Sequence, residues 1–453
     1  MTGNFTTGSG RIAFILCRQS RKYPTVTIDS SEEKLARYLF SLRRFGIRLG
    51  LENITRLLQV LQNPQCSFKA IHVAGTNGKG STGAMMASIF QKAGYKTGLY
   101  VSPHLFSFRE RIRVNGEWIF LSAVQTYLKK IRTTIDTYHC TFFEVMTAIA
   151  FAYFADQGVE YAIVETGLGG RLDATNVLNP VASVITEIDL DHTETLGGNV
   201  RDIAREKAGI IKPNTPVITS AHNHEAIDVF NEICREREST LYPVVQECRY
   251  KDRIISPEKM EFTVQTPLNL YSSISLRLLG VHQIWNAVTA IRTAELLEGG
   301  DSKINGESIK KGLAETYWPG RFEIYSGNPT IILDVAHNPN GMTQLVKTFR
   351  LVFHQKKFVL MMGVLADKDF ESMIDNVVPQ AKEVIAVQPN NPRALTSSKL
   401  AEEIQKRNVP VQAAGTVKMG FAVFRKRARD DDILVITGSS YSVSDALLEL
   451  VKM

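Results

Sequence analysis

A glycine-rich segment with one lysine and one serine is the part of this sequence best suited to chemistry. It lies within KAIHVAGTNGKGST, residues 69–82, and comprises Gly75, Thr76, Asn77, Gly78, Lys79, Gly80 and Ser81. Backbone N–H groups in such a turn bind phosphate oxygens, the lysine neutralises the outer phosphates, and the serine hydroxyl can bind Mg²⁺. The common phosphate-binding pattern places the hydroxyl residue directly after the lysine, whereas here Gly80 intervenes. The segment therefore predicts a nucleotide phosphate site of a variant kind.

Side chains that can bind a metal ion follow two later apolar runs. Glu165 follows the run at 161–164, and His192 follows the run at 181–188 within the motif LDHT. The carboxyl ends of parallel strands share one edge of an α/β sheet, where such proteins bind their ligands. Mg²⁺ in nucleotide sites is held by phosphates and by one or two carboxylates. Ser81 and Glu165 are therefore candidate Mg²⁺ ligands, with His192 at the same edge.

Further candidates lie beyond residue 200. Lys207 lies on a short polar helix, and by itself this context predicts a surface lysine. Asp334 and His337 follow an apolar run in DVAHNP, and Arg321 follows the turn at 318–320, within reach of an anion bound between two domains. His222 and His224 resemble a metal-binding pair, but their polar surroundings favour a surface loop.

The apolar runs predict the elements that position these residues. Runs at 70–74, 97–101, 161–164, 181–188 and 217–219 read as strands, and helical patterns from 31, up to 60, from 81 to 94, at 122–135 and at 142–155 surround them. Residues 102–113 read as a loop, 240–280 as an antiparallel insert and 286–297 as a helix. Strands at 331–333, 358–362, 383–387 and 433–437 alternate with helices after a hinge formed by the glycines at 299–300 and the turn at 318–320. We therefore expect an α/β protein with domains at 31–318 and 319–453, preceded by a loose extension at 1–30.

Composition excludes several classes of protein. No apolar run among the 453 residues approaches the ~20 that span a bilayer, so we expect no membrane domain. The net charge of +7 is spread along the chain, which favours small anionic ligands over nucleic acid. Five cysteines without a C-x-x-C pair favour a reducing, cytoplasmic compartment. Residues 1–30 carry several basic residues and no acidic residue before Asp29. This composition leaves an organellar transit peptide as an alternative to a loose extension.

The motifs taken together resemble those of the bacterial dihydrofolate synthase/folylpolyglutamate synthase family, which is related to the Mur ligases. The matching segments are HVAGTNGKGST (72–82), SPHL (102–105), TFFE (141–144), ETGLGGRLDATN (165–176), LDHT (190–193), REKAGI (205–210), PGRFE (319–323), DVAHNP (334–339) and GVLADKD (363–369). The glycine between Lys79 and Ser81 is itself the family's form. The resemblance implies an N-terminal P-loop ATPase domain with a mostly parallel sheet and a smaller C-terminal Rossmann-like α/β domain, with catalysis between them.

The resemblance also implies a reaction. A pterin carboxylate attacks the γ-phosphate of ATP, and the amine of L-glutamate then displaces phosphate from the acyl phosphate. Lys79, Lys207 and His337 would serve catalysis, with Lys207 as an N6-carboxylysine. Ser81, Glu165 and His192 would bind two Mg²⁺ ions. Asn286, Arg321 and Asp334 match three further positions of the family that contact ATP. Ser439 and Tyr441 match positions near the incoming glutamate. The segments that border the pterin site match Leu49, Gly50, Thr141, Phe142, Phe143, Glu144, Leu172, Asp173 and Ala174.

Several alternatives stay open at this point. The chain could have only one of the two activities, or it could be a Mur-type ligase for another acceptor, although the matches at 141–144 and 172–174 argue against that. A GTPase would need an N-K-x-D motif, which ADKD at 366–369 does not supply. A nucleic-acid ATPase would show a concentrated basic stripe, which this sequence lacks. We expect a monomer that binds small molecules, with neither nucleic acid nor a membrane as partner. Arg109, Arg111 and Arg113 lie in one loop, where they either steer a polyanionic glutamate tail or form a solvated face.

Overall fold

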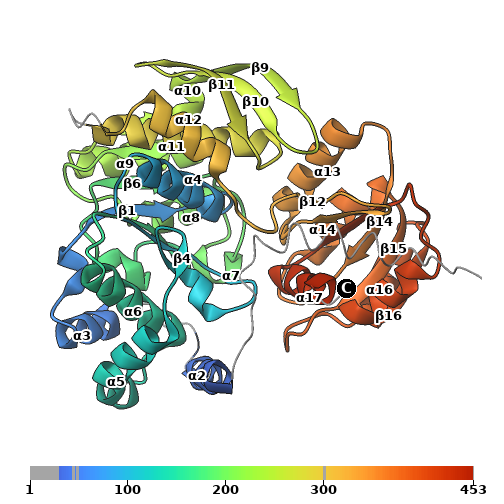
Figure 1. The fold of residues 1–453 in the computed structure, drawn as a ribbon, viewed down its shortest axis with the longest axis horizontal. Helices are drawn as coiled ribbons and strands as arrows, with labels where there is room; N and C mark the ends of the chain where they lie inside the picture. Colours follow the sequence, from blue (N-terminus) through green and yellow to red (C-terminus); the bar gives the residue numbers. More distant parts are fainter. Residues whose placement is uncertain (1–29, 43–45, 47–49, 299–302, 452–453) are drawn as a thin grey trace, which may run out of the picture.

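The computed structural model describes residues 30–42, 46, 50–298 and 303–451, which form two bodies around separate large sheets (Figure 1). The first sheet has the strand order β4-β3-β2-β5-β1-β6-β7-β8. Its strands are β1 (Lys69–Ala74), β2 (Thr97–Tyr100), β3 (Ile112–Val114), β4 (Glu117–Trp118), β5 (Tyr161–Glu165), β6 (Ala182–Ile185), β7 (Val217–Thr219) and β8 (Leu241–Pro243). All neighbours pair in parallel except those of β3 and β4, which form an antiparallel edge. The mostly apolar sequence of β1, in which only the buried His72 interrupts the run at 70–74, follows from its central place, because helices cover both faces of the sheet.

Helices on the two faces of this sheet form separate cores. On one side lie α4 (Lys79–Lys92), α11 (Val281–Glu298) and α12 (Gly306–Glu315); on the other lie α2 (Ser30–Ser41), α3 (Glu52–Val60), α5 (Leu121–Tyr138) and α6 (Phe142–Asp156). Near β7 lie α7 (Thr193–Leu196), α8 (Val200–Ala208), α9 (His224–Glu236) and α10 (Val244–Glu247), and short 3₁₀ turns occupy η3 (Pro64–Cys66), η4 (Phe108–Arg111) and η5 (Ala174–Val177). An antiparallel sheet of β9 (Arg249–Ile255), β10 (Met260–Gln265) and β11 (Leu270–Leu276) covers α12 and α11 (Figure 1).

The second body is built on a sheet with the order β12-β13-β17-β14-β15-β16, in which only β12 is antiparallel. Its strands are β12 (Glu323–Tyr325), β13 (Thr330–Leu333), β14 (Phe358–Met362), β15 (Ala381–Gln388), β16 (Val411–Thr416) and β17 (Ile433–Thr437). Its helices are α13 (Pro339–Phe353), α14 (Phe370–Val377), α15 (Ser397–Gln405), α16 (Val417–Arg425) and α17 (Ser440–Val451), with the turn η6 (Val378–Gln380). The carboxyl ends of its parallel strands face the first body, which brings two ligand-binding edges together.

The predicted fold class is confirmed, and the differences are local. The predicted strand at 181–188 is too long, because the β6 ladder ends at Ile185. Beyond it, Glu187 forms only an isolated bridge with Asn77, and Ile188 is buried against helices. The predicted loop at 102–113 is wrong at its end, where residues 108–111 form η4 and residues 112–113 enter β3. Strand β8 lies in the main sheet, although the sequence suggested that residues 240–280 form one insert. The extension at 1–30 lies outside the described residues apart from Ser30, and the boundary at 318–319 stays a prediction.

Among the described residues, no helix combines the length and apolar character needed to cross a membrane. The four cysteines in this part of the chain are free thiols, at Cys66, Cys140, Cys234 and Cys248.

Candidate active site

The glycine-rich turn joins β1 to α4 and has the backbone of a phosphate-binding loop. Gly75 has φ +147° and Gly78, the N-cap of α4, has φ +94°, conformations that side chains rarely adopt. A Cβ on Gly78 would lie 2.5 Å from Asn286 Oδ1, so the space at Gly78 as well as its backbone conformation requires glycine. Helix α4 begins at Lys79, two positions before the predicted start, and its first N–H groups therefore point into the turn.

Gly80, the residue that separates Lys79 from Ser81, has a packing explanation. A Cβ at this position would lie 3.0 Å from Trp318 Nε1 and 3.3 Å from two carbons of the indole ring. The first turn of α4 therefore packs closely against Trp318, in the segment that links the two bodies. The sequence alone did not identify Trp318 as part of the site.

Two lysines converge on the carbonyl groups of the loop. Lys79 Nζ donates to Gly75 O at 3.0 Å and Thr76 O at 3.3 Å and lies 4.0 Å from Glu165 Oε1. Lys207 Nζ, on α8, donates to the same Gly75 O at 2.8 Å. Lys207 is buried, so the surface position suggested by its helix alone is wrong. Burial, reinforced by the charge of Lys79, lowers the pKa of Lys207 to about 7.

The predicted metal ligands lie at the edge of the first sheet. Glu165 is the last residue of β5 and is buried; burial raises the pKa of its carboxyl group, and the charge of Lys79 opposes this shift. Ser81 is buried in the first turn of α4, and His192 precedes α7 with φ +52°. Partial burial lowers the pKa of His192 to about 4, so its imidazole is neutral at neutral pH. The described chain has no group of three His, Cys, Asp or Glu side chains arranged for a metal, so phosphate and water oxygens would have to complete any coordination shell here.

The second body contributes the opposite wall through residues that follow β13. Asp334 accepts hydrogen bonds from the backbone N–H groups of Phe322 and Ala336, both at 2.8 Å. Burial raises the pKa of Asp334 to about 6, although the charge of Arg321 opposes the shift. His337 lies three residues further on, with Nδ1 3.0 Å from Val335 O. The structure thus places Arg321, Asp334 and His337 opposite the glycine-rich loop.

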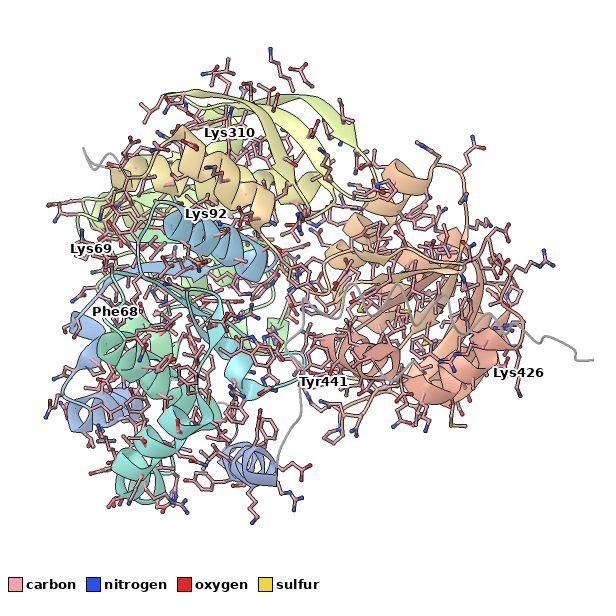
Figure 2. The ribbon with its side chains drawn as sticks, in the orientation of Figure 1. Phe68, Lys69, Lys92, Lys310, Lys426 and Tyr441 are labelled. Atoms are coloured by element: carbon pink, nitrogen blue, oxygen red, sulfur yellow. The ribbon has the colours of Figure 1, made fainter. Side chains whose placement is uncertain are left out.

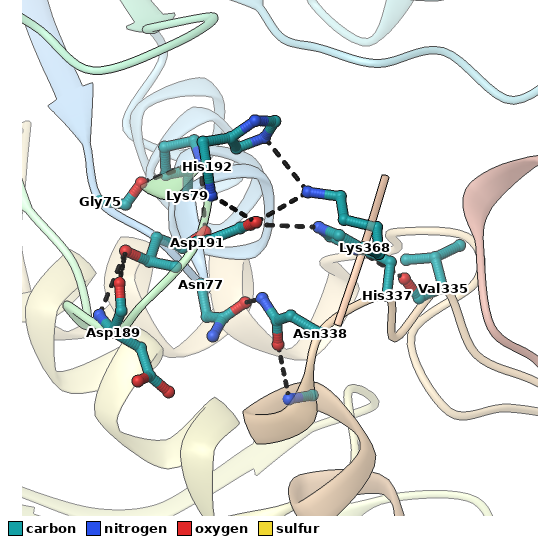
Figure 3. A network of polar contacts seen from close by, with 12 residues as sticks. Gly75, Asn77, Lys79, Asp189, Asp191, His192, Val335, His337, Asn338 and Lys368 are labelled. Carbon is teal, nitrogen blue, oxygen red and sulfur yellow. Dashed lines mark hydrogen bonds and ion pairs between the residues drawn. The ribbon is translucent and has the colours of Figure 1, made fainter. Parts of the chain in front are cut away.

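Polar contacts join the two walls directly (Figure 3). Lys368 Nζ lies 2.7 Å from Asp191 Oδ1 and 3.3 Å from His192 Nε2, and His337 Nε2 lies 3.9 Å from Asp191 Oδ2. Burial favours protonation of Asp191, but the charges of Lys368 and the histidines outweigh it, and the pKa falls to about 2. Asn338 Nδ2 donates to Asn77 Oδ1 at 3.0 Å. Sequence reasoning assigned no role to these contacts, because it could not pair motifs on different bodies.

The walls enclose a cleft of about 750 Å³ and a smaller adjoining cavity of about 240 Å³. The cleft is lined by all seven residues of the glycine-rich loop and by Glu165, His192, Lys207, Asn286, Arg321, Asp334 and His337. The smaller cavity is lined by Ser439 and Tyr441 together with Gly80, Glu165, His192, Arg321 and His337. Tyr441 lies on the side of its body that faces the first body (Figure 2). The structure therefore brings the predicted nucleotide, metal and glutamate residues to one continuous space.

The predicted pterin-site residues lie behind the lining of these two cavities. Thr141 and Glu144 form a capping box at the start of α6, with Thr141 N donating to Glu144 Oε2 at 2.6 Å. Asp173 accepts hydrogen bonds from the N–H groups of Gly167 and Leu168, both at 2.9 Å, so it orders the loop after Glu165. None of the described members of this set lines either cavity, namely Gly50, Thr141, Phe142, Phe143, Glu144, Leu172, Asp173 and Ala174. Leu49 lies outside the described residues.

The histidines of HNH lie on the surface, in keeping with the prediction. His222 and His224 are both exposed, and His224 is the first residue of α9. His222 Nδ1 contacts Glu187 Oε2, and its ring meets Trp285 edge to face at 5.7 Å. His222 and Trp285 both line the cleft of about 750 Å³, a position that the polar sequence around His222 did not indicate.

Comparisons with known proteins show which families and structures the chain resembles. Residues 73–294 match the family model of the Mur ligase middle domain, and residues 320–440 match that of the Mur ligase glutamate ligase domain. A dihydrofolate synthase/folylpolyglutamate synthase of Bacillus subtilis is 35% identical over 413 residues, covering 89% of this chain and 95% of that protein. The structure of Mycobacterium tuberculosis folylpolyglutamate synthase complexed with ADP is similar with a TM-score of 0.86 at 30% identity, over 93% of this chain and 98% of that one. A bifunctional folylpolyglutamate synthase/dihydrofolate synthase with Mn, AMPPNP and L-glutamate bound has a TM-score of 0.80 at 29% identity, over 92% and 98% of the two chains.

Proposed function

The chain belongs to the dihydrofolate synthase/folylpolyglutamate synthase family of Mur-type ligases, and we propose that it uses ATP to join L-glutamate to dihydropteroate and to the glutamyl tail of folates. The observation that carries this proposal is the cleft between two sheet edges. One wall holds a phosphate loop with Lys79, and the other holds Arg321, Asp334 and His337. A ligase needs this arrangement because three substrates must meet with their reacting atoms aligned.

We propose the following roles for the chain's own residues. Lys79 and the N–H groups of the loop hold the outer phosphates of ATP, while Arg321, Asp334 and Asn286 hold the rest of the nucleotide. The acceptor carboxylate attacks the γ-phosphorus to give an acyl phosphate and ADP; the glutamate amine then attacks the acyl carbon and phosphate leaves. Positioning and neutralisation of phosphate charge account for most of the acceleration in such transfers.

The donor set suits a divalent ion bound together with the nucleotide. Ser81 and Glu165 offer hard oxygen atoms beside Lys79, and the neutral imidazole of His192 offers nitrogen to a second ion. A bound Mg²⁺ would neutralise phosphate charge. The buried Nδ2 of Asn77 has no hydrogen-bond partner within the described chain, as expected for a donor that serves a bound ligand.

Lys207 fits carboxylation, because only the neutral amine reacts with carbon dioxide and its pKa is about 7. The resulting carbamate would carry oxygen ligands toward the metal. We assign Ser439, Tyr441 and His337 to the glutamate end of the site, which they line. Residues 141–144 and 172–174 are kept as borders of the pterin site, and we take one chain as the working unit because both walls come from it.

The test is a pair of assays on the purified protein. Formation of ADP is measured with ATP and L-glutamate, first with dihydropteroate and then with tetrahydrofolate as acceptor. The proposal predicts ADP formation that requires both glutamate and acceptor. Turnover with only one acceptor would restrict the protein to one of the two activities, and turnover with neither would refute the folate assignment. A Lys79→Met variant controls for contaminating ATPases.

A further inference from the structure

The three arginines of residues 109–113 are not the solvated basic patch that the sequence allowed. Arg109 lies 3.5 Å from the carboxylate of Glu32, through its NH1 group. Arg111 is buried, and its Nε donates to His104 Nδ1 at 2.8 Å. Both groups are thus committed to contacts within the first body, and the steering role proposed for the whole segment is not supported. Arg113 differs from them.

Arg113 presents a guanidinium group without a carboxylate partner. It lies in β3, where its Nε donates to Glu110 O at 3.0 Å and its guanidinium carbon lies 4.8 Å from the centre of the Trp318 ring. Across the described residues, no Asp or Glu oxygen lies within ion-pair distance of it. Burial lowers the pKa of Arg113, and Glu110 and Tyr317 oppose the shift only through longer-range charge. A partly desolvated guanidinium without a counter-ion is stabilised by a bound anion.

Arg113 lines the cavity of about 240 Å³ beside the nucleotide cleft. Trp318 separates Arg113 from Gly80, and the indole lies within 3.0 Å of the position that a Cβ on Gly80 would occupy. An anion on Arg113 would therefore lie one indole ring away from the loop that holds the outer phosphates. That anion would be close to the reacting carboxylate without being the reacting group itself.

The two acceptors of the proposed function differ in one chemical respect at this point. Dihydropteroate has a single carboxylate, which is the group that reacts. A folate that already carries glutamate has a reacting γ-carboxylate and, a short aliphatic chain away, an α-carboxylate that does not react. Resting on the proposed function, we infer that Arg113 binds the α-carboxylate of a glutamylated acceptor and so supports tail extension specifically.

The position of Arg113 favours the acceptor over the incoming glutamate. Arg113 and Trp318 form the wall of the cavity on the side of the first body, whereas Ser439 and Tyr441, assigned to the incoming glutamate, form the wall on the side of the second. Planar guanidinium and carboxylate groups pair through parallel hydrogen bonds, which fixes the orientation of the acceptor as well as its affinity.

The experiment compares the two acceptors in one variant. With Arg113→Met, kcat/KM for tetrahydrofolate is expected to fall about 10- to 100-fold, as for loss of a charged hydrogen-bond pair, while the value for dihydropteroate changes less than about threefold. Arg113→Lys, which keeps the charge without the forked geometry, is expected to fall between wild type and Arg113→Met. Arg109→Met is the matched control, because it removes an arginine of the same segment that does not line the cavity. Its ratio of the two kcat/KM values should equal that of the wild type.

Other outcomes would overturn the inference. An equal loss with both acceptors, or a raised KM for glutamate when dihydropteroate is the acceptor, would place Arg113 at the incoming glutamate or in a structural role. A wild-type enzyme that used dihydropteroate alone, or a variant with both acceptors unaffected, would also contradict it. Failure of the wild type with both acceptors would instead refute the proposed function.

Discussion

Lys207 places an amine with a pKa of about 7 beside the phosphate loop, and this predicts that activity depends on dissolved carbon dioxide. At a pH of about 7.5, such an amine is roughly three-quarters neutral, whereas an ordinary lysine is neutral in only about one molecule in a thousand. The population that can form a carbamate is therefore several hundred-fold larger, by the same arithmetic. The carbamate would also place near Lys79 a negative charge that can bind a cation.

The assay measures the initial rate in decarbonated buffer and again after addition of bicarbonate. Wild-type activity is expected to fall on removal of carbon dioxide and to recover with bicarbonate, and ¹³C-bicarbonate should give a carbamate resonance in the protein. Lys207→Met should lose about 100-fold or more in kcat, as for loss of a preorganised charge, without any response to bicarbonate. Lys212→Met is the control, since Lys212 Nζ donates to Asn176 O and does not line the cleft. Equal rates in both buffers together with no carbamate resonance would exclude carboxylation of Lys207.

Three further predictions concern the loop and the opposite wall. Gly78→Ala should weaken ATP binding, measured by calorimetry, about tenfold, because a φ of +94° is strained for alanine and the added Cβ would meet Asn286. Gly94→Ala is the control: Gly94 has φ +86° but open space around it, so this variant should lose stability without losing ATP affinity. ATP affinity should fall as the pH drops through about 6, where Asp334 takes up a proton. Asp334→Asn should bind ATP weakly, and its affinity should not change with pH in this range. If the variant kept the same fall in affinity, Asp334 would be excluded as its source. Lys368→Met should lower the free energy of unfolding in urea by about 2 kcal/mol, because it leaves the largely buried Asp191 unpaired, and a change near zero would contradict this.

The local parts of the site could be predicted from the sequence because they depend on neighbouring residues. An apolar strand followed by glycines and a helix fixes the phosphate loop within a few positions, and Glu165 lies at the end of its strand as expected. The predicted end of β6 failed for a physical reason. Ile188 is apolar because it is buried among helices, so an apolar residue follows the end of the β6 ladder without belonging to it.

Contacts between distant segments could not be predicted. Lys207 lies on a polar helix, yet it is buried and its Nζ donates to Gly75 O, 132 positions earlier in the chain. The pairs that join the two bodies, Lys368 with Asp191 and Asn338 with Asn77, are 177 and 261 positions apart. The difference between Arg113 and its neighbours Arg109 and Arg111 likewise depends on which of them faces the cavity, which sequence spacing does not determine.

In the proposed mechanism, ATP activates the acceptor carboxylate before glutamate attacks it. The most direct test uses dihydropteroate labelled with ¹⁸O in its carboxylate, together with ATP and L-glutamate, and analyses the released phosphate by mass spectrometry. We expect one ¹⁸O atom in each phosphate formed along with product, because the oxygen that attacks the γ-phosphorus leaves with it. Unlabelled phosphate, or phosphate release that does not require glutamate and acceptor, would exclude an acyl-phosphate intermediate.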